Sequence, residues 1–147
     1  DLRLEQVELA MAHGRHLANA VHAEHCWPAT DRSAMDGFAL RAGPGLPAGA
    51  TLPVVGESLA GKPFDAALPV GTAIRIMTGA VVPFFNDTAT TEIYTSGFAG
   101  STVVVHDAVQ AGANVRRRAS ELAAGALVLP IGRRVRAAEI GVLAVLG

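Results

Sequence analysis

The chain has 147 residues, half of them apolar, and a formal net charge of −1. This length can bury a core as one compact domain or two small lobes, and the near-neutral charge argues against a nucleic-acid-binding protein. No apolar run approaches the ~20 residues of a membrane span, and no signal-peptide pattern opens the sequence. The single Cys26 rules out an internal disulfide and fits a reducing compartment. We therefore expect a cytoplasmic protein that binds neither nucleic acid nor membrane.

Two helical patterns open the chain. Apolar residues recur at helical spacing from Leu4 to Met11, which predicts a helix that ends near Gly14. The apolar pattern resumes over residues 17–21 and indicates a second short helix, which Pro28 would end. The N-terminal region is therefore expected to be helical.

Between residues 28 and 125, glycine and proline separate short runs rich in β-branched residues. Such punctuation is typical of a β-rich lobe with tight turns rather than of a βαβ sheet. No internal repeat and no Rossmann-like or P-loop pattern occurs. The predicted strands are 52–55, 73–77, 102–106 and 126–129.

The last segment predicts a helix over 137–146. Ile140, Leu143 and Leu146 fall at helical spacing, and Glu139 lies in the first turn, where the helix dipole favours a carboxylate. Together the elements define a β-rich α+β fold with an N-terminal and a C-terminal helix, and without a Rossmann-like domain.

The composition of residues 84–95 departs from that of the flanking sequence. This stretch holds four of the nine Thr, the only Tyr and two of the five Phe. Residues 86–95 also look like the in-frame translation of a flow-cell adapter oligonucleotide. We interpret the stretch as a sequencing-adapter artefact and assign it no function; the alternative is a genuine polar loop of unusual composition.

Two short motifs set a small polar residue beside a glycine, between apolar residues. In Ser33-Ala34-Met35-Asp36-Gly37, the Asp36 carboxylate could simply stabilise its own turn, or could position a ligand or a metal-bound oxyanion. Ser33 is a candidate anion contact, although its small side chain also lets the turn pack closely.

The second motif is Met77-Thr78-Gly79-Ala80, at the end of a predicted strand. The Thr78 hydroxyl could satisfy a local backbone group. Alternatively, it could form a small anion-binding concavity together with the backbone N–H groups of Gly79 and Ala80.

A basic run supplies a third candidate. Arg116 and Arg118, in an Arg triplet, form either a solvated edge or a phosphate clamp. The nearby Glu121 contributes a carboxylate. A zinc site at His22, His25 and Cys26 lacks a second ligand pair, and Trp27 and Phe38 are expected to be packing residues.

The two motifs, in this order and about forty residues apart, resemble the molybdopterin molybdotransferase family, which includes the E domain of gephyrin. The resemblance implies an elongated β-rich lobe over 26–125 and a linker lobe formed by 1–25 and 126–147. It also implies a homodimer that inserts molybdenum from molybdate into adenylated molybdopterin, with the help of Mg²⁺.

By resemblance, Asp36 and Glu121 are carboxylates near the metal or molybdate, and Thr78 is an oxyanion donor. Family members continue into an α/β domain and a small β domain. The chain therefore resembles only their N-terminal region, and we expect it to be catalytically inactive by itself. Where the family has Gly-Glu-Asp, this chain has Ala119-Ser120-Glu121. That difference keeps open an alternative, a non-catalytic dimerisation or scaffold module.

Overall fold

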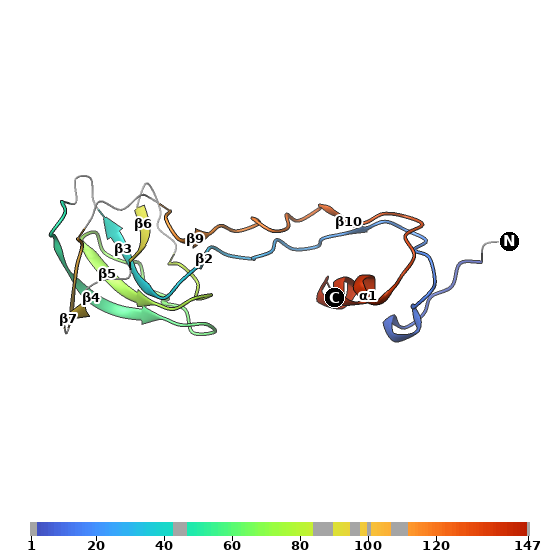
Figure 1. The fold of residues 1–147 in the computed structure, drawn as a ribbon, viewed down its shortest axis with the longest axis horizontal. Coiled ribbons are helices and arrows are strands. Elements are labelled where there is room, and N and C mark those ends of the chain that lie inside the picture. The colour runs from blue at the N-terminus through green and yellow to red at the C-terminus, as the bar shows by residue number, and fades with distance from the viewer. Residues whose placement is uncertain are drawn as a thin grey trace. The chain divides into compact units, whose positions relative to one another are not determined.

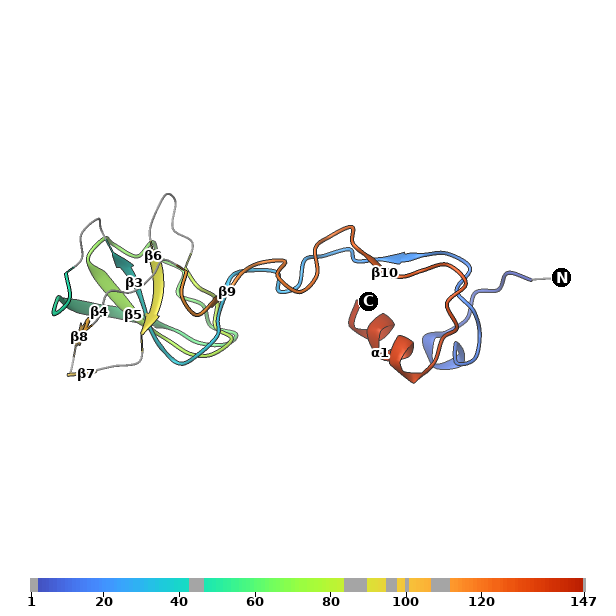
Figure 2. The ribbon, with the colours of Figure 1, turned by 45° about the horizontal axis from the view of Figure 1, so that its top comes forward.

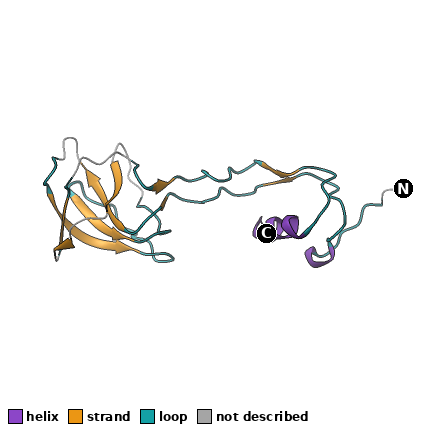
Figure 3. Cartoon of the chain, viewed as in Figure 1, coloured by secondary structure: helices purple, strands orange, loops and turns teal. Residues whose placement is uncertain are grey.

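The computed structural model describes residues 3–42, 47–83, 90–94, 98–99, 101–106 and 112–146. The chain divides into two compact units (Figure 1). Unit 1 consists of Asp1–Trp27 and Ala119–Gly147, and unit 2 of Pro28–Arg118. Figure 3 shows that strands dominate the regular structure and that, among the described residues, helix occurs only in unit 1. The predicted β-rich α+β fold class is confirmed.

Unit 2 contains a six-stranded sheet in the order β6-β3-β5-β4-β8-β7 (Figure 2). Neighbouring strands pair antiparallel, except that β4 and β5 pair in parallel. The strands predicted at 52–55, 73–77 and 102–106 correspond to β4, β5 and β8. The strand bounds are β3 Gly37–Ala42, β4 Thr51–Ser58, β5 Thr72–Ile76, β6 Thr90–Tyr94, β7 Phe98–Ala99 and β8 Thr102–Val104.

Both faces of this sheet are covered by apolar side chains. Successive residues of a strand point to opposite faces, so Phe38 and Leu40 join one core cluster while Ala39 joins the other. This is why residues 38–40 of β3 are consecutively apolar rather than alternating with polar residues. The first cluster is Ala39, Leu68, Ile74, Ile76, Ala80 and Val82; the second is Phe38, Leu40, Leu52, Ala73, Val103 and Val105.

A glycine lets an aromatic ring lie against β4. A Cβ placed on Gly56 would stand 2.5 Å from Cε2 of Phe64, closer than packed carbons approach. The register between β4 and β5 shifts over the same stretch, between Val54 and Glu57. At the end of β4, the fully buried Ser58 donates to the Val81 carbonyl at 2.8 Å, which satisfies its hydroxyl in the core.

A two-stranded ladder brings together the two chain segments of unit 2 that lie farthest apart in sequence. Strand β2 (Arg32–Ser33) pairs antiparallel with β9 (Val115–Arg116). The backbone of Ala34 extends the contact by donating to the Asn114 carbonyl at 2.8 Å. The first motif is therefore hydrogen-bonded, just before β3 begins, to the last part of unit 2.

Unit 1 is built around a long, irregular pair of extended segments. Strand β1 (Val21–His22) pairs antiparallel with β10 (Leu127–Leu129), the strand predicted at 126–129. Isolated bridges, His16 with Arg134 and Trp27 with Leu122, continue the pairing at either end. In Figure 1 these blue and orange segments run side by side.

The predicted N-terminal helices are not formed. Only one 3₁₀ turn, η1 (Leu9–Met11), occurs before Gly14, and the second predicted helix is replaced by β1. From Gly14 onward the backbone bonds across the chain instead: Gly14 N–H donates to the Val135 carbonyl at 2.8 Å and Leu17 N–H to the Arg133 carbonyl at 2.9 Å. Groups used in this ladder cannot also make helical bonds.

The C-terminal helix is confirmed with the predicted bounds, as α1 (Ala137–Leu146). Its first-turn residue Glu139 is buried, with 4% of its surface exposed. Glu139 Oε2 accepts a bond from the Arg136 backbone N–H at 3.0 Å, which closes half of a capping box at the start of the helix. The sequence had indicated only a favourable interaction with the helix dipole.

Residues 84–89 and 95 of the stretch interpreted as an adapter artefact lie outside the described residues. Its residues 90–94 form β6 and pair with β3 through backbone groups. Within the described part of the chain, α1 and every other helical segment are too short to be a membrane span.

Candidate functional site: two interlocked turns

The second motif forms a tight turn at the end of β5. The Ala80 N–H donates to the Met77 carbonyl at 2.9 Å, which closes a four-residue turn. Gly79, the third residue of this turn, has a φ of +78°. A type II turn needs a positive φ at this position, and glycine adopts it without strain. The glycine of the motif is therefore required by backbone geometry.

The first motif is locked onto this turn by paired backbone bonds. Ser33 N–H donates to the Ala80 carbonyl at 3.0 Å, and Gly79 N–H donates to the Ser33 carbonyl at 2.9 Å. The buried Ser33 hydroxyl donates to the Met35 carbonyl at 2.5 Å, inside its own turn. Ser33 is thus a structural residue that joins the two motifs, and its hydroxyl is engaged within the protein.

Asp36 and Thr78 meet where the two turns face each other. Asp36 Oδ1 accepts two bonds from Thr78, one from the backbone N–H and one from the hydroxyl, each 2.7 Å long. The residues lie 42 positions apart in sequence. Their meeting was not predicted, because each motif was interpreted separately from the residues around it.

The two bonds from Thr78 favour the ionised form of the Asp36 carboxyl. The backbone N–H of Thr78 lowers the pKa of Asp36 most, its hydroxyl adds to this, and the positive charge of Arg75 contributes in the same direction. Asp36 is exposed. Among the described residues, its second oxygen, Oδ2, has no hydrogen-bond partner. The site therefore presents one carboxylate oxygen to solvent.

The expected anion-binding concavity is not formed by the groups assigned to it. The N–H groups of Thr78, Gly79 and Ala80 donate to Asp36, Ser33 and Met77 respectively. The Thr78 hydroxyl proton is also used by Asp36. The prediction failed because these donors hold the two turns together, so they do not converge on an open space.

Two further residues complete the lock, and sequence analysis gave neither a role. Arg32 Nη1 donates to the Gly79 carbonyl at 2.9 Å from a partly buried position. Asp31 Oδ1 accepts a hydrogen bond from the Arg118 backbone N–H at 2.6 Å. Its other oxygen, Oδ2, forms an ion pair with Arg117 Nη1 at 2.9 Å. Both residues lie just before Ser33 in the sequence, but their partners lie too far along the chain for spacing to reveal them.

The predicted phosphate clamp lies on β9 and just after it. Arg116 faces Arg32 in the β2–β9 register, and the side chains of Arg116 and Arg118 are exposed. Asp31 fixes the backbone at Arg118 and leaves its side chain at the surface. These two guanidinium groups belong to the same unit as Asp36 and Thr78.

Glu121 belongs to unit 1, where it lines a cavity of about 530 Å³. The other lining residues are mostly apolar and include Trp27, Leu122 and several residues of α1. Trp27 was expected to be a packing residue, but 57% of its surface is exposed, whereas Phe38 is buried as expected. The Trp27 backbone, in contrast to the ring, is fixed by two hydrogen bonds with the Leu122 backbone.

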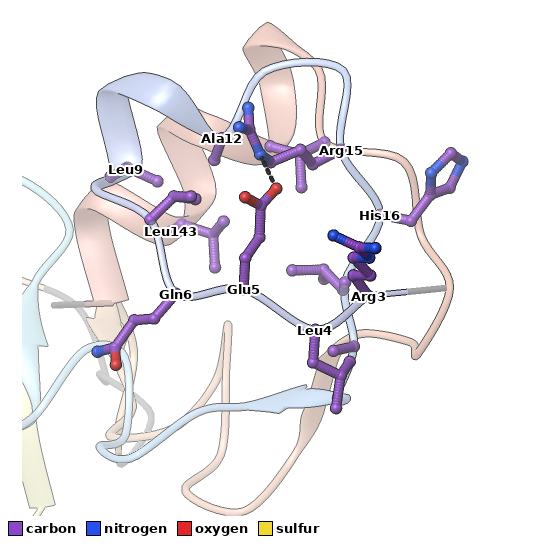
Figure 4. A pocket seen from close by; sticks show the side chains of 13 residues that line it. Arg3, Leu4, Glu5, Gln6, Leu9, Ala12, Arg15, His16 and Leu143 are labelled. Atoms are coloured by element: carbon purple, nitrogen blue, oxygen red, sulfur yellow. Dashed lines mark hydrogen bonds and ion pairs between the residues drawn. The ribbon is translucent and has the colours of Figure 1, made fainter. Parts of the chain in front are cut away.

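A second cavity of unit 1, of about 640 Å³, lies against the N-terminal segment that was expected to be helical. Figure 4 shows that Glu5 and Arg15, which both line it, point toward each other, and Arg15 Nε donates to Glu5 Oε1 at 2.6 Å. Leu4, Leu9 and Leu143 supply apolar lining. None of the predicted site residues lines this cavity.

The described residues contain no group of three or more His, Cys, Asp or Glu side chains that could hold a metal ion. Asp36 offers a single ionised carboxylate. A Mg²⁺ ion commonly keeps several waters and takes only one or two protein carboxylates. The donor set therefore fits one Mg²⁺ ligand at Asp36, and not a closed metal site.

The fold matches those of solved molybdopterin biosynthesis proteins. The "molybdopterin biosynthesis moeA protein" of Pyrococcus horikoshii OT3 superposes with a TM-score of 0.80 at 28% identity, covering 97% of this chain and 38% of that one. Residues 2–147 match the family described as "MoeA N-terminal region (domain I and II)". The chain belongs to this family.

Curated relatives agree with this assignment. The molybdopterin molybdenumtransferase of Haemophilus influenzae is 32% identical over 143 residues, which cover 97% of this chain and 35% of the relative. The molybdopterin molybdenumtransferase of Nostoc sp. is 37% identical over 144 residues, which cover 95% of this chain and 33% of the relative. The chain thus spans about a third of the length of these relatives.

Proposed function

We propose that this chain is the N-terminal region of a molybdopterin molybdenumtransferase, which inserts molybdenum from molybdate into adenylated molybdopterin. Family membership and the names of the relatives support this assignment. The observation that carries it is the pair of interlocked turns, because they hold an ionised, outward-facing carboxylate at Asp36. A group fixed before the substrate arrives costs little reorganisation during the reaction.

The candidate residues other than Thr78 have the following roles in this proposal. Asp36 supplies a carboxylate oxygen to a cation or to a hydrogen-bond donor of the substrate. Arg116 and Arg118 supply guanidinium groups for phosphate oxygens, whose geometry they match. Glu121, a residue of unit 1, is proposed as a carboxylate near the metal or molybdate on the family resemblance alone. Gly79 and Ala80 act through the turn they form, and Ser33 acts by joining that turn to the first motif.

Mg²⁺ is proposed as a cofactor, with Asp36 as a ligand. When bound, it would supply positive charge that helps the adenylate phosphate leave. Asp36 is suited to this because its carboxyl stays ionised and its Oδ2 is accessible. The assembly is proposed to be a homodimer in the cytoplasm, as the family resemblance implies.

The test is a chimera in which this chain replaces the matching N-terminal third of the Haemophilus influenzae relative. It is expressed in cells that lack their own molybdenumtransferase, and a molybdenum-dependent enzyme activity is measured. We expect the chimera to restore activity, and Asp36→Asn to lower it by roughly a hundredfold, as loss of a preorganised polar group does. Asp65→Asn, which changes another exposed carboxylate of unit 2, should have no effect.

A chimera that accumulates as a folded protein and restores nothing would contradict the catalytic assignment. Full restoration by the Asp36→Asn chimera would contradict the role given to Asp36. In the first case the non-catalytic scaffold module would become the better account of this chain.

A further inference from the structure

We propose that Thr78 is a positioning residue: its N–H and hydroxyl hold the Asp36 carboxylate so that Oδ2 alone faces the substrate. This assigns Thr78 a role opposite to that of an oxyanion donor. The inference rests on the proposed function, since it concerns the same site. It names the chemistry that the site accepts, which is a hydrogen-bond donor or a cation rather than an oxyanion.

The first argument is the number of protons available. A hydroxyl carries one proton and a backbone amide carries one. Both protons of Thr78 point at Asp36 Oδ1, at 2.7 Å each. Neither is left to stabilise a negative oxygen of the substrate. For Thr78 to do so, the Asp36 carboxylate would first have to lose a donor.

The second argument is charge. An oxyanion placed at Thr78 would lie beside an ionised carboxylate, and two like charges in contact repel. The two Thr78 donors bonded to Oδ1 hold this carboxylate in place. Oδ2 can therefore accept a bond from an N–H or O–H group, or coordinate a cation, whereas a bare anion would be disfavoured.

The third argument is the contrast with the threonine at the other end of β5. Thr72 donates its hydroxyl to the Pro69 carbonyl at 2.7 Å, three residues away, which is an ordinary local bond. Thr78 reaches a side chain 42 residues away and binds it twice. Thr72 is therefore a matched control for the loss of a strand-end hydroxyl.

The deciding experiment is a carbon-detected NMR titration of the Asp36 carboxyl group in the 147-residue chain. Thr78→Val removes the hydroxyl and keeps the shape, and we expect it to raise the pKa of Asp36 toward the ordinary value of 3.8. Thr78→Ser keeps the hydroxyl and should leave the pKa low, as should Thr72→Val. A pKa of Asp36 that does not respond to Thr78→Val overturns the proposal.

The chimera gives a second, functional readout. Thr78→Val should lower activity by roughly tenfold, and Thr78→Ser should keep it within about twofold. In the Asp36→Asn background, Thr78→Val should cost less than about twofold further, because residues that act as a unit are not additive. Equal losses in both backgrounds would give Thr78 an independent role and overturn the proposal.

The two assays separate the failure of this proposal from failure of the proposed function. An inactive unsubstituted chimera counts against the function, while the titration still tests the role of Thr78. An active chimera with an unresponsive Asp36 pKa counts against the role of Thr78 alone. If the Asp36→Asn background has no measurable activity, the titration decides.

Discussion

Arg133 donates two hydrogen bonds to a single carboxylate oxygen of Glu139, from Nε at 2.8 Å and from Nη2 at 2.6 Å. The other oxygen of Glu139 accepts the Arg136 backbone N–H. One buried side chain therefore fastens the start of α1 to the segment that follows β10. Since Arg133 also takes part in the backbone ladder with Leu17, this contact joins the helix to the body of unit 1.

The stability of the chain should depend on the ionisation of Glu139. The Arg133 side chain is the largest cause that lowers the pKa of Glu139 below its ordinary 4.5. A group with a lowered folded-state pKa stabilises the fold above its unfolded-state pKa, and loses that effect as pH falls. Glu139→Gln should therefore lower stability at pH 7, and the difference from the unsubstituted chain should shrink below about pH 4.5.

Urea unfolding at a series of pH values measures this difference. Glu57→Gln, which changes an exposed carboxylate on β4, is the control and should change the stability little. A Glu139→Gln difference as large at pH 3 as at pH 7 would contradict the role of ionisation.

The same substitution at two glycines should have opposite effects. Gly56→Ala places a Cβ against the Phe64 ring, at 2.5 Å, and should destabilise by about 1–3 kcal/mol through overpacking. Gly141→Ala, in α1 with open space around it, should stabilise by about 0.5–1 kcal/mol, because alanine loses less backbone freedom in a helix. Urea unfolding checks both; equal effects at the two positions would count against the packing argument.

Arg32 should be important for the geometry of the second motif. Arg32→Ala removes a partly buried, charge-assisted bond to the Gly79 carbonyl and should destabilise by about 1.5–3 kcal/mol. Arg134→Ala, at an exposed position of unit 1, should cost less than about 0.5 kcal/mol. Urea unfolding measures both losses of stability. In Arg32→Ala we also expect NMR chemical-shift changes centred on Thr78 and Gly79. Unchanged chemical shifts in this turn would contradict the role of Arg32 in its geometry.

The origin of residues 84–95 can be tested on the gene itself. We expect long-read sequencing of the source locus to show a gene without the coding stretch for residues 86–95, since we interpret that stretch as adapter sequence. It should also show an open frame that continues into the regions present in the longer relatives. If the stretch persists in the genome, the artefact interpretation is wrong and the segment is a genuine part of unit 2.

Elements with strong local signals were predicted well. The strands around Ala73 and Val103 and the helix at Ala137–Leu146 have a dense apolar pattern bounded by glycine or proline, and they form. The N-terminal helix was wrong although its apolar spacing was helical. The second predicted helix was also wrong: backbone pairing of residues 14–17 with residues 132–135 outweighed the local preference, and one sequence gives no sign of such distant pairing.

For the site, sequence analysis found the two motifs but not how they fit together. Asp36 and Thr78 were both singled out, yet their mutual bonds and the use of the Gly79 N–H by Ser33 appear only in three dimensions. Asp31 was passed over because its ion-pair partner lies 86 residues away. Contacts between turns depend on tertiary arrangement, which periodicity and spacing do not encode.

The bond between Asp31 and Arg117 has a consequence for protein synthesis. Because its partners are 86 residues apart, the ribosome must release nearly all of unit 2 before this contact can form. The first motif is synthesised early. Until the segment around Arg117 emerges from the ribosome, this motif lacks the contact and its polar turn stays exposed to solvent and chaperones. Such late, long-range closure slows folding. A chain truncated between Ala80 and Arg117 would carry both motifs and still lack this contact.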